Sequence, residues 1–468
     1  MKNNPFQNWF NSEFLHEYLT GHIEILMKKR MNFRLIPFAF LTCILFSIKP
    51  ALAQEKLTLE EAVQIALQNN YDIKLSNNSV ELAKVDVSRG LSALYPTVTG
   101  NFNTNNTVSN TNQTLSNGQS QEREGAKNTN LAYGPVLNWR IFDGFEMFAR
   151  YDQLKEFQKL GESNLKLTIQ NTIANVVSNY YDLVQQQQQI KALDTALVIS
   201  RIRLQNSQSR YQIGKAAKLE VLAATVDLNT DTTNLLRQVD VYRNTKTLLN
   251  ELLAREINTE FTVSDTIIIQ KDLSLAQIQT AAGEQNPELQ GALISQRIAE
   301  LNLKQVKANR YPDISVNTGY NFNRSTSELG FARQSQSRGL NYGVTASINI
   351  FSGFLQRRNE KSADLEIDNS RLIYERLNQN INSQIAILYQ TYQTNIELVK
   401  LEQENLGVAQ QNLDITLEKF RLGSVAPVEF REAQRNYIDA NARFTNAQYQ
   451  AKLAEINLKQ IAGSISLQ

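Results

Sequence analysis

Four stretches of the chain alternate between apolar and polar positions, the pattern of a β-strand with one apolar face. In the first, Val98 and Phe102 fall on one face and Asn101 and Asn103 on the other. Each strand has about ten residues, enough to cross a bilayer when tilted. The intervening segments, rich in Asn, Ser, Thr and Gln, are predicted to be surface loops. The predicted strands are residues 97–106, 131–142, 313–323 and 340–351, and the loops are 106–130 and 323–339.

Apolar residues at steps of three and four predict two very long helices, over about residues 146–209 and 355–419. The stripe of the first includes Ile173 and Tyr180, and Tyr392 continues the corresponding stripe of the second. At 1.5 Å per residue, each helix would be about 97 Å long. This spacing favours side-by-side packing as coiled coils.

Shorter helices precede each pair of strands. Thr58 and Glu61 have the spacing of a capping box, which begins the first of them. Pro96 and Pro312 each follow a tyrosine and end a helix, because the residue before a proline is pushed out of the helical region.

The whole pattern occurs twice. Ile141-Phe142-Asp143-Gly144-Phe145 recurs 209 residues later as Ile350-Phe351-Ser352-Gly353-Phe354. A repeat of this size predicts two equivalent halves and points away from a single catalytic pocket. The predicted repeats are residues 54–262, with a long helix hairpin at 145–254, and residues 263–468, with a hairpin at 354–462.

The N-terminus is predicted to be a leader and signal peptide, residues 1–53. Basic residues 28–30 precede a short apolar run, and Ala51-Leu52-Ala53 ends it, the order of a secretory signal. Translation is expected to start at Met27 or Met31, with a genuinely longer leader as the alternative.

Removing the leader also removes His16, His22 and Cys43, so the mature chain contains neither histidine nor cysteine. That composition excludes thiolate and imidazole metal sites, disulfides and histidine-based nucleophilic catalysis. We therefore expect no enzyme activity, no cofactor and no metal. The remaining 42 basic and 43 acidic residues indicate no nucleic-acid partner.

After the leader, no apolar stretch approaches the length of a membrane-spanning helix. An exported chain of this kind is either soluble or an outer-membrane β-barrel, and the alternating strands favour the barrel. Four strands cannot close a barrel, and an open edge in lipid leaves backbone groups without partners. Further copies must supply strands: three would give about 12, although strand counting also allows two.

Together these features resemble the TolC-type outer membrane efflux protein family, from about Leu57 to Gly463. The resemblance implies a mixed α and β membrane protein in the outer membrane of a Gram-negative cell. It implies a homotrimer whose 12-stranded β-barrel, embedded in outer membrane lipid, continues into a long α-helical coiled-coil barrel in the periplasm. Its expected partners are a periplasmic adaptor protein and an inner-membrane transporter of the RND or ABC type.

The resemblance also assigns site residues. The helix tips expected to contact the adaptor are Gly214, Lys215, Ala216 and Ala217 in the first repeat and Gly423, Ser424, Val425 and Ala426 in the second. A helix hairpin without a partner is the alternative. The expected periplasmic gate is Glu429 and Glu432, three residues apart and so on one helical face. The family usually has aspartates there, and ordinary solvated surface is the alternative.

Phe142, Gly144, Phe351 and Gly353 mark the predicted strand-to-helix joints. Their aromatic rings fit an interfacial girdle or plain packing. The predicted function is a passive exit duct for small molecules, driven by an inner-membrane pump through the adaptor. The alternatives are the duct of a type I protein secretion system and, from another class, a soluble periplasmic coiled-coil scaffold.

Overall fold

The computed structural model describes residues 55–114, 116–264, 266–328 and 332–465. The leader predicted at residues 1–53, with both candidate start methionines, lies outside the described residues. The body of the protein forms one unit from Lys56 onward.

The two halves contain the same elements in the same order: two helices, two strands, a very long helix and a shorter one. Equivalent helices have equal lengths of 11, 22, 67 and 35 residues in both halves. The first half comprises α3 (Leu59–Asn69), α4 (Tyr71–Ser92), β2 (Thr97–Thr114), β3 (Ser120–Asp143), α5 (Glu146–Gln212) and α6 (Lys218–Leu252). The second comprises α7 (Leu275–Gln285), α8 (Pro287–Ala308), β5 (Asp313–Ser327), β6 (Gln334–Ser347), α9 (Leu355–Arg421) and α10 (Pro427–Ile461). Two short strands, β1 (Glu55–Lys56) and β4 (Phe261–Thr262), pair with each other.

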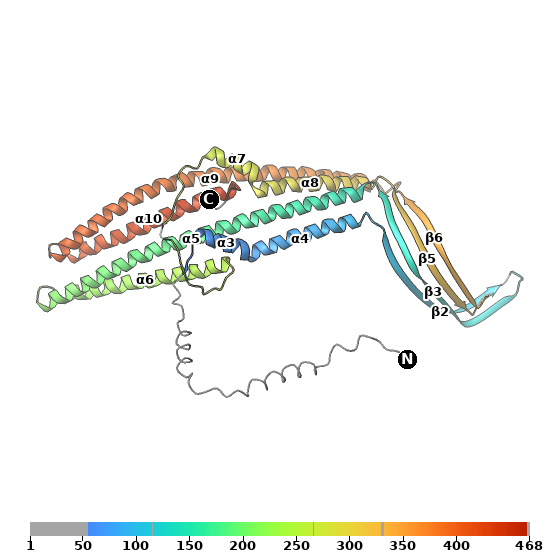
Figure 1. Cartoon of the computed structure of the whole chain (residues 1–468), viewed down its shortest axis with the longest axis horizontal. Coiled ribbons are helices and arrows are strands. Elements are labelled where there is room, and N and C mark those ends of the chain that lie inside the picture. Colours follow the sequence, from blue (N-terminus) through green and yellow to red (C-terminus); the bar gives the residue numbers. More distant parts are fainter. Residues whose placement is uncertain (1–54, 115, 265, 329–331, 466–468) are drawn as a thin grey trace, which may run out of the picture. The chain divides into compact units, whose positions relative to one another are not determined.

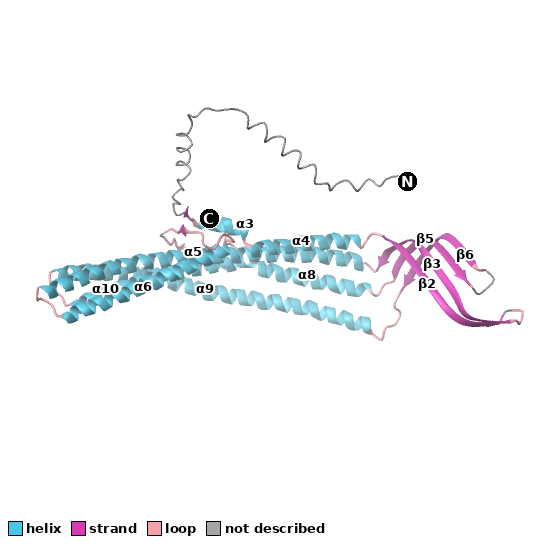
Figure 2. Cartoon of the chain, turned by 90° about the horizontal axis from the view of Figure 1, so that it is seen from below, coloured by secondary structure: helices cyan, strands magenta, loops and turns pink. Residues whose placement is uncertain are grey.

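The helices lie side by side, with the strands gathered at one end of them (Figures 1 and 2). The helices form one layer with a different order at its two ends. Away from the strands the order is α6-α5-α10-α9, and next to the strands it is α4-α5-α8-α9. We call α5–α6 the first hairpin and α9–α10 the second hairpin. Among the described residues, no helix combines the length and the hydropathy needed to cross a membrane.

Two equivalent asparagines join the shorter helices end to end. Asn70 Oδ1 accepts the N–H groups of Asp72 and Ile73 at the start of α4, while its amide nitrogen donates to the Leu252 carbonyl at the end of α6. Asn286 makes the same three contacts between α8 and α10. Each buried side chain thus satisfies backbone groups that a helix end leaves without partners.

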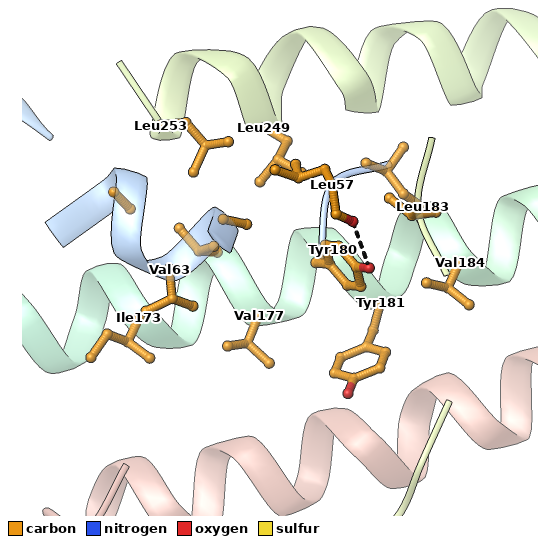
Figure 3. Close-up of a cluster of buried hydrophobic side chains, with 14 of the residues drawn as sticks. Leu57, Val63, Ile173, Val177, Tyr180, Tyr181, Leu183, Val184, Leu249 and Leu253 are labelled. Atoms are coloured by element: carbon orange, nitrogen blue, oxygen red, sulfur yellow. Dashed lines mark hydrogen bonds between the residues drawn. The ribbon is translucent and has the colours of Figure 1, made fainter. Parts of the chain in front are cut away.

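The largest apolar core surrounds Tyr180 at mid-length of α5 (Figure 3). Its ring is buried with Leu57, Leu183 and Leu249, which come from different segments of the first half. The Tyr180 hydroxyl donates to the Leu57 carbonyl at 3.0 Å and accepts the Ser264 N–H at 3.1 Å. The core therefore fixes the connecting segments against the long helix and satisfies the one polar atom of the ring.

The sheet is antiparallel throughout, with strand order β2-β3-β5-β6. The strands of the first half are longer than predicted: β2 runs to Thr114 and β3 begins at Ser120, so most of the predicted loop 106–130 is strand. Much of the loop 323–339 is likewise strand, since β5 runs to Ser327 and β6 begins at Gln334.

The last predicted strand ends early, at Ser347 instead of residue 351. Ser347 pairs with Asp313, the first residue of β5 after Pro312. Residues beyond Ser347 have no partner on that strand, because Pro312 has no N–H to donate.

Candidate functional site

The two tip turns have the same backbone geometry. Gly214 and Gly423 both have φ +75°, in the left-handed region that favours glycine. In the first turn, Lys215 N–H donates to the Arg210 carbonyl at 2.8 Å and Gly214 N–H to the Tyr211 carbonyl at 3.0 Å. The second turn repeats both bonds one repeat later. Both long helices therefore end in a Schellman motif, as a tight hairpin requires.

The tips lie together at the end of the helices away from the sheet (Figure 1). They share a groove of about 830 Å³. Its lining combines apolar side chains with three cationic ones: Ile202, Ile213, Phe420 and Leu422 with Arg210, Lys215 and Arg421. Of the predicted tip residues, Gly423 and Lys215 line this groove. The other predicted tip residues belong to the same two turns, and of these Ala216 and Val425 are half-buried.

Glu429 and Glu432 lie in the first turns of α10, just beyond the second tip. Both side chains are exposed, whereas Phe430, between them, is buried and stacks on Phe420 with ring centroids 4.9 Å apart. The two carboxylates therefore share the face of α10 opposite to its packed side. Glu220, the first-repeat counterpart of Glu429, is instead half-buried.

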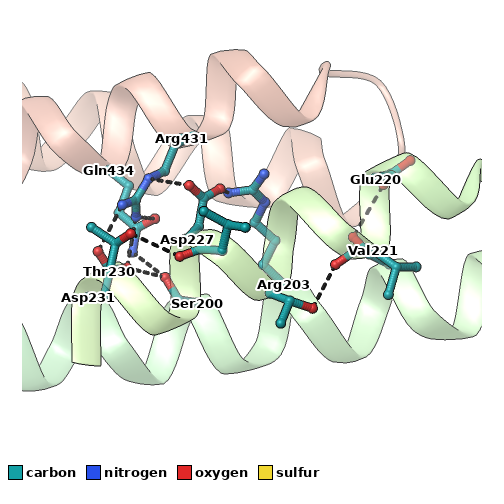
Figure 4. A network of polar contacts seen from close by, with 12 residues as sticks. Ser200, Arg203, Glu220, Val221, Asp227, Thr230, Asp231, Arg431 and Gln434 are labelled. Atoms are coloured by element: carbon teal, nitrogen blue, oxygen red, sulfur yellow. Dashed lines mark hydrogen bonds and ion pairs between the residues drawn. The ribbon is translucent and has the colours of Figure 1, made fainter. Parts of the chain in front are cut away.

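A buried salt bridge joins the two hairpins near the tips (Figure 4). Arg431 on α10 donates through both terminal nitrogens to the two carboxylate oxygens of Asp231 on α6, each at 2.8 Å. Its Nε lies 3.5 Å from Asp227. Burial lowers the pKa of Arg431, but the hydrogen bond and charges of the two aspartates outweigh it and leave that pKa above its ordinary value.

Two uncharged side chains extend this contact to α5. Gln434 donates to the Ala196 carbonyl at 2.9 Å and to the Ser200 hydroxyl at 3.0 Å. Ser200 in turn donates to Asp231 at 2.5 Å. We call Ser200, Asp227, Asp231, Arg431 and Gln434 the inter-hairpin network. It holds the start of α10, which carries both predicted gate glutamates, against the first hairpin.

The inter-hairpin network was not predicted from the sequence. One signal was available: Asp227 and Asp231 are four residues apart on α6, and like charges at that spacing destabilise a helix unless cations face them. Arg203 supplies one such cation from α5, 2.5 Å from Asp227. The other, Arg431, comes from 200 residues further along the chain, which no local pattern reveals.

The register of the sheet places the apolar side chains on one face. Val98 lies opposite Leu137, and Phe102 opposite Tyr133, which lies opposite Phe322. The Tyr133 and Phe322 rings stack with centroids 5.0 Å apart. The other face carries the asparagines and serines that alternate with these residues. The sheet thus has one apolar and one polar face, as the alternation predicted.

At the strand-to-helix joints, two consecutive residues adopt the left-handed region. Gly144 and Gly353 have φ +71° and +63°, and the phenylalanines that follow them, Phe145 and Phe354, have φ +69° and +65°. A Cβ on Gly144 would lie 2.3 Å from the Ala308 carbonyl oxygen, so only glycine fits there. Left-handed phenylalanines are rare, and no local sequence pattern predicts them.

The aromatic side chains of the joints differ in exposure. Phe142 is half-buried, whereas Phe351 is 74% exposed; each packs edge-on against the left-handed phenylalanine of its own joint. The Asp143 carboxylate accepts the Met147 N–H at 3.0 Å and so caps α5. The predicted joint residues thus lie where strand passes into helix in both halves.

Comparison with known proteins identifies the family. The family model for outer membrane efflux proteins matches residues 62–255 and 278–464. The outer membrane protein TolC of Vibrio cholerae is 21% identical over 321 residues, 68% of this chain and 73% of that protein. The outer membrane efflux protein BepC of Brucella suis is 18% identical over 410 residues, 87% of this chain and 86% of that one.

The fold is also that of a solved outer membrane channel. The crystal structure of the CmeC outer membrane channel of Campylobacter jejuni superimposes with a TM-score of 0.74 at 18% identity, covering 87% of this chain and 85% of that one. The resemblance and the fold class predicted from the sequence are confirmed. The chain belongs to the outer membrane efflux protein family and is an outer membrane protein that extends into the periplasm.

Proposed function

We propose that the protein is the outer membrane duct of a tripartite efflux system, a passive exit path for small molecules. The observation that carries the proposal is the four-stranded sheet with one apolar and one polar face and two free edges. Lipid suits the apolar face and water the polar one. The edges, β2 and β6, need partners, because unpaired backbone groups are not tolerated in lipid.

Three copies, each pairing its β2 with the β6 of the next, close a barrel of about 12 strands. The helices support the same head-to-tail assembly. Away from the strands, the two outer helices of the layer, α6 and α9, carry exposed apolar stripes at coiled-coil spacing. These stripes include Leu219, Leu222 and Val226 on α6 and Leu401, Val408 and Ile415 on α9. Each outer helix would pack against a neighbouring copy, and the layer would close into a tunnel.

The helix tips would receive the periplasmic adaptor. Support comes from the shared groove between the two turns, whose exposed apolar side chains, Ile213 and Leu422, lie beside three cationic ones and suit an amphipathic helix of a partner. The energy for transport would come from an inner-membrane RND or ABC transporter linked through that adaptor. The duct itself needs no cofactor, since it only has to open and close.

The gate would be formed by Glu429 and Glu432. In a trimer, three copies of each exposed carboxylate would make two acidic rings, which attract cations and exclude anions. The gate is tested by ion selectivity of the reconstituted protein in planar bilayers. Glu429→Gln/Glu432→Gln should lose cation selectivity while still conducting.

Glu418→Gln is the matched control for the gate test. Glu418 is an exposed carboxylate on the same hairpin, paired with Arg421 at 2.7 Å, and is not assigned to the gate. The control should keep wild-type selectivity. Selectivity that survives in the double variant would refute the gate assignment, and loss of selectivity in the control would show a general surface-charge effect.

A further inference from the structure

Two arginines lie on the apolar face of the sheet. They mark the end of the apolar part of that face, on the side away from the helices. Arg338 on β6 is directly opposite Phe322, which is opposite Tyr133, so the three side chains share one face. One step further out, Arg324 on β5 is opposite Leu131 on the same face. Guanidinium groups on a lipid-facing surface are costly unless they reach the headgroup region or bind an anion there.

Strand geometry places these arginines at the edge of the membrane. From Ile141, near the joint, to Leu131 is ten residues along β3. At about 3.4 Å per residue this is about 34 Å along the strand, or about 24 Å across the membrane at a tilt of about 45°. The apolar band of outer membrane proteins is about 25 Å tall. Because the helices extend into the periplasm, the arginines lie at the outer-leaflet border.

The same residues, together with Asn323, Gln336 and Ser337, surround a hollow of about 440 Å³. Its apolar wall is Leu131 with the stacked Tyr133 and Phe322 rings, and its cationic wall is Arg324 and Arg338. With the Gln334 amide turned so that its oxygen faces Arg324, that oxygen accepts from Nε at 3.0 Å and from Nη2 at 3.1 Å, which orients the guanidinium.

The positive charges of the cationic wall are not neutralised within the described part of the chain. Both arginine side chains are exposed, and among the described residues no carboxylate forms an ion pair with either. A pair of guanidinium groups beside an aromatic wall matches a ligand with an anionic head and an apolar tail. The anion would bind the forked donors, and an acyl chain would lie on the rings.

We propose that this hollow binds a phosphate-bearing lipid of the outer leaflet. Arg324 and Arg338 hold the phosphate, while Tyr133, Phe322 and Leu131 contact the first part of an acyl chain. A free phosphate would use only the cationic wall and a neutral lipid only the apolar one. The site therefore prefers a molecule that presents both at the membrane surface, and it anchors the sheet at a fixed depth.

Native mass spectrometry of the full, detergent-purified protein with added lipid A tests the proposal. Wild-type protein should bind bisphosphorylated lipid A at least about tenfold more tightly than its dephosphorylated form, since charge-assisted hydrogen bonds would be lost with the phosphates. Arg324→Gln/Arg338→Gln should lose a similar factor for the bisphosphorylated lipid. Arg123→Gln, in the part of β3 beyond the hollow, is the matched control and should bind like wild type.

Three results would overturn the proposal: equal binding of both lipid forms by wild-type protein, wild-type affinity in the double variant, or displacement of the lipid by inorganic phosphate at equal concentration. The comparison of lipid forms uses unaltered protein, so it holds even if the double variant folds poorly. Arg338→Lys keeps the charge but loses the fork, and it should bind with intermediate affinity. Channel conductance is measured separately, so failure of the lipid site leaves the proposed duct untouched.

Discussion

The position of α10 against the first hairpin should depend on Asp231, at the centre of the inter-hairpin network. Its side chain is 3% exposed and accepts two bonds from Arg431 and one from Ser200. Asp231→Ala would remove all three and leave Arg431, itself 15% exposed, with Asp227 at 3.5 Å as its remaining anion. At this level the second hairpin would then keep the two Gln434 bonds, the weaker Asp227 pair and the packing of Ile199 against Phe420 and Phe430.

The size of the effect follows from burial. Removing one partner of a buried ion pair costs about 3–5 kcal/mol. The lower end applies here, because Asp227 still faces Arg431 and the arginine keeps some access to water. About 3 kcal/mol corresponds to a shift of about a hundredfold in the equilibrium between closed and open tips, if the network is intact only when the tips are closed.

Single-channel recording of Asp231→Ala measures this shift as a larger open fraction, and thermal unfolding followed by circular dichroism shows whether the helices survive. Adding Arg431→Ala to Asp231→Ala should restore part of the lost stability, because no buried guanidinium is then left without its partner. Arg371→Ala is the control: it breaks an exposed pair with Glu375, 3.1 Å away on the same helix of the second hairpin, and should cost less than about 1 kcal/mol. An unchanged open fraction in folded Asp231→Ala would show that the network does not hold α10 in place.

Three further predictions concern the helices. Tyr180→Phe removes the hydroxyl that bonds Leu57 and Ser264, and it should lower the free energy of unfolding by about 1–3 kcal/mol in denaturant titration; an unchanged midpoint would contradict it. Burial raises the pKa of Tyr181 to about 12, so between about pH 10 and 12 the unfolded chain loses a proton that the folded protein keeps. Stability should fall as the pH rises through that window, and Tyr181→Phe should flatten the slope. Gly423→Ala should cost about 1 kcal/mol at φ +75°, whereas Gly407→Ala, within α9, should stabilise; equal effects would argue against the left-handed turn.

Local patterns predicted the helices well. The capping box of Thr58 and Glu61 is present with both of its hydrogen bonds, because it needs only residues three positions apart. The buried stripe through Ile173, Tyr180 and Tyr392 is confirmed, since its helical spacing reports directly which face is packed. The equivalent helices of the two halves have equal lengths, as the sequence repeat predicts.

The strands were predicted less completely. Residues 106–114 of β2 and 120–130 of β3 lack an apolar face, so alternation gives no signal there. These segments pair through their backbones, and a polar side chain on either face does not prevent that pairing. A hydrogen bond from Gly125 N–H to the Asn110 side chain marks a bulge at this level, which depends on both strands at once.

The candidate site was predicted only in part. The tip turns could be located because a glycine after a long helix is a local signal. Glu429 and Glu432 are exposed on one face of α10, but their role at a gate stays a prediction, since it depends on neighbouring copies. The inter-hairpin network brings together residues from different helices, and the hollow beside Arg324 and Arg338 brings together residues from different strands. Neither could therefore be predicted before the fold was known.

We propose that several copies of this chain close its four-stranded sheet into a duct. The most direct test is single-channel conductance of the purified protein in planar bilayers, with the number of copies per particle counted by native mass spectrometry. We expect particles of three copies that insert and pass small cation-selective currents. Folded protein that remains a single copy and gives no conductance would contradict it.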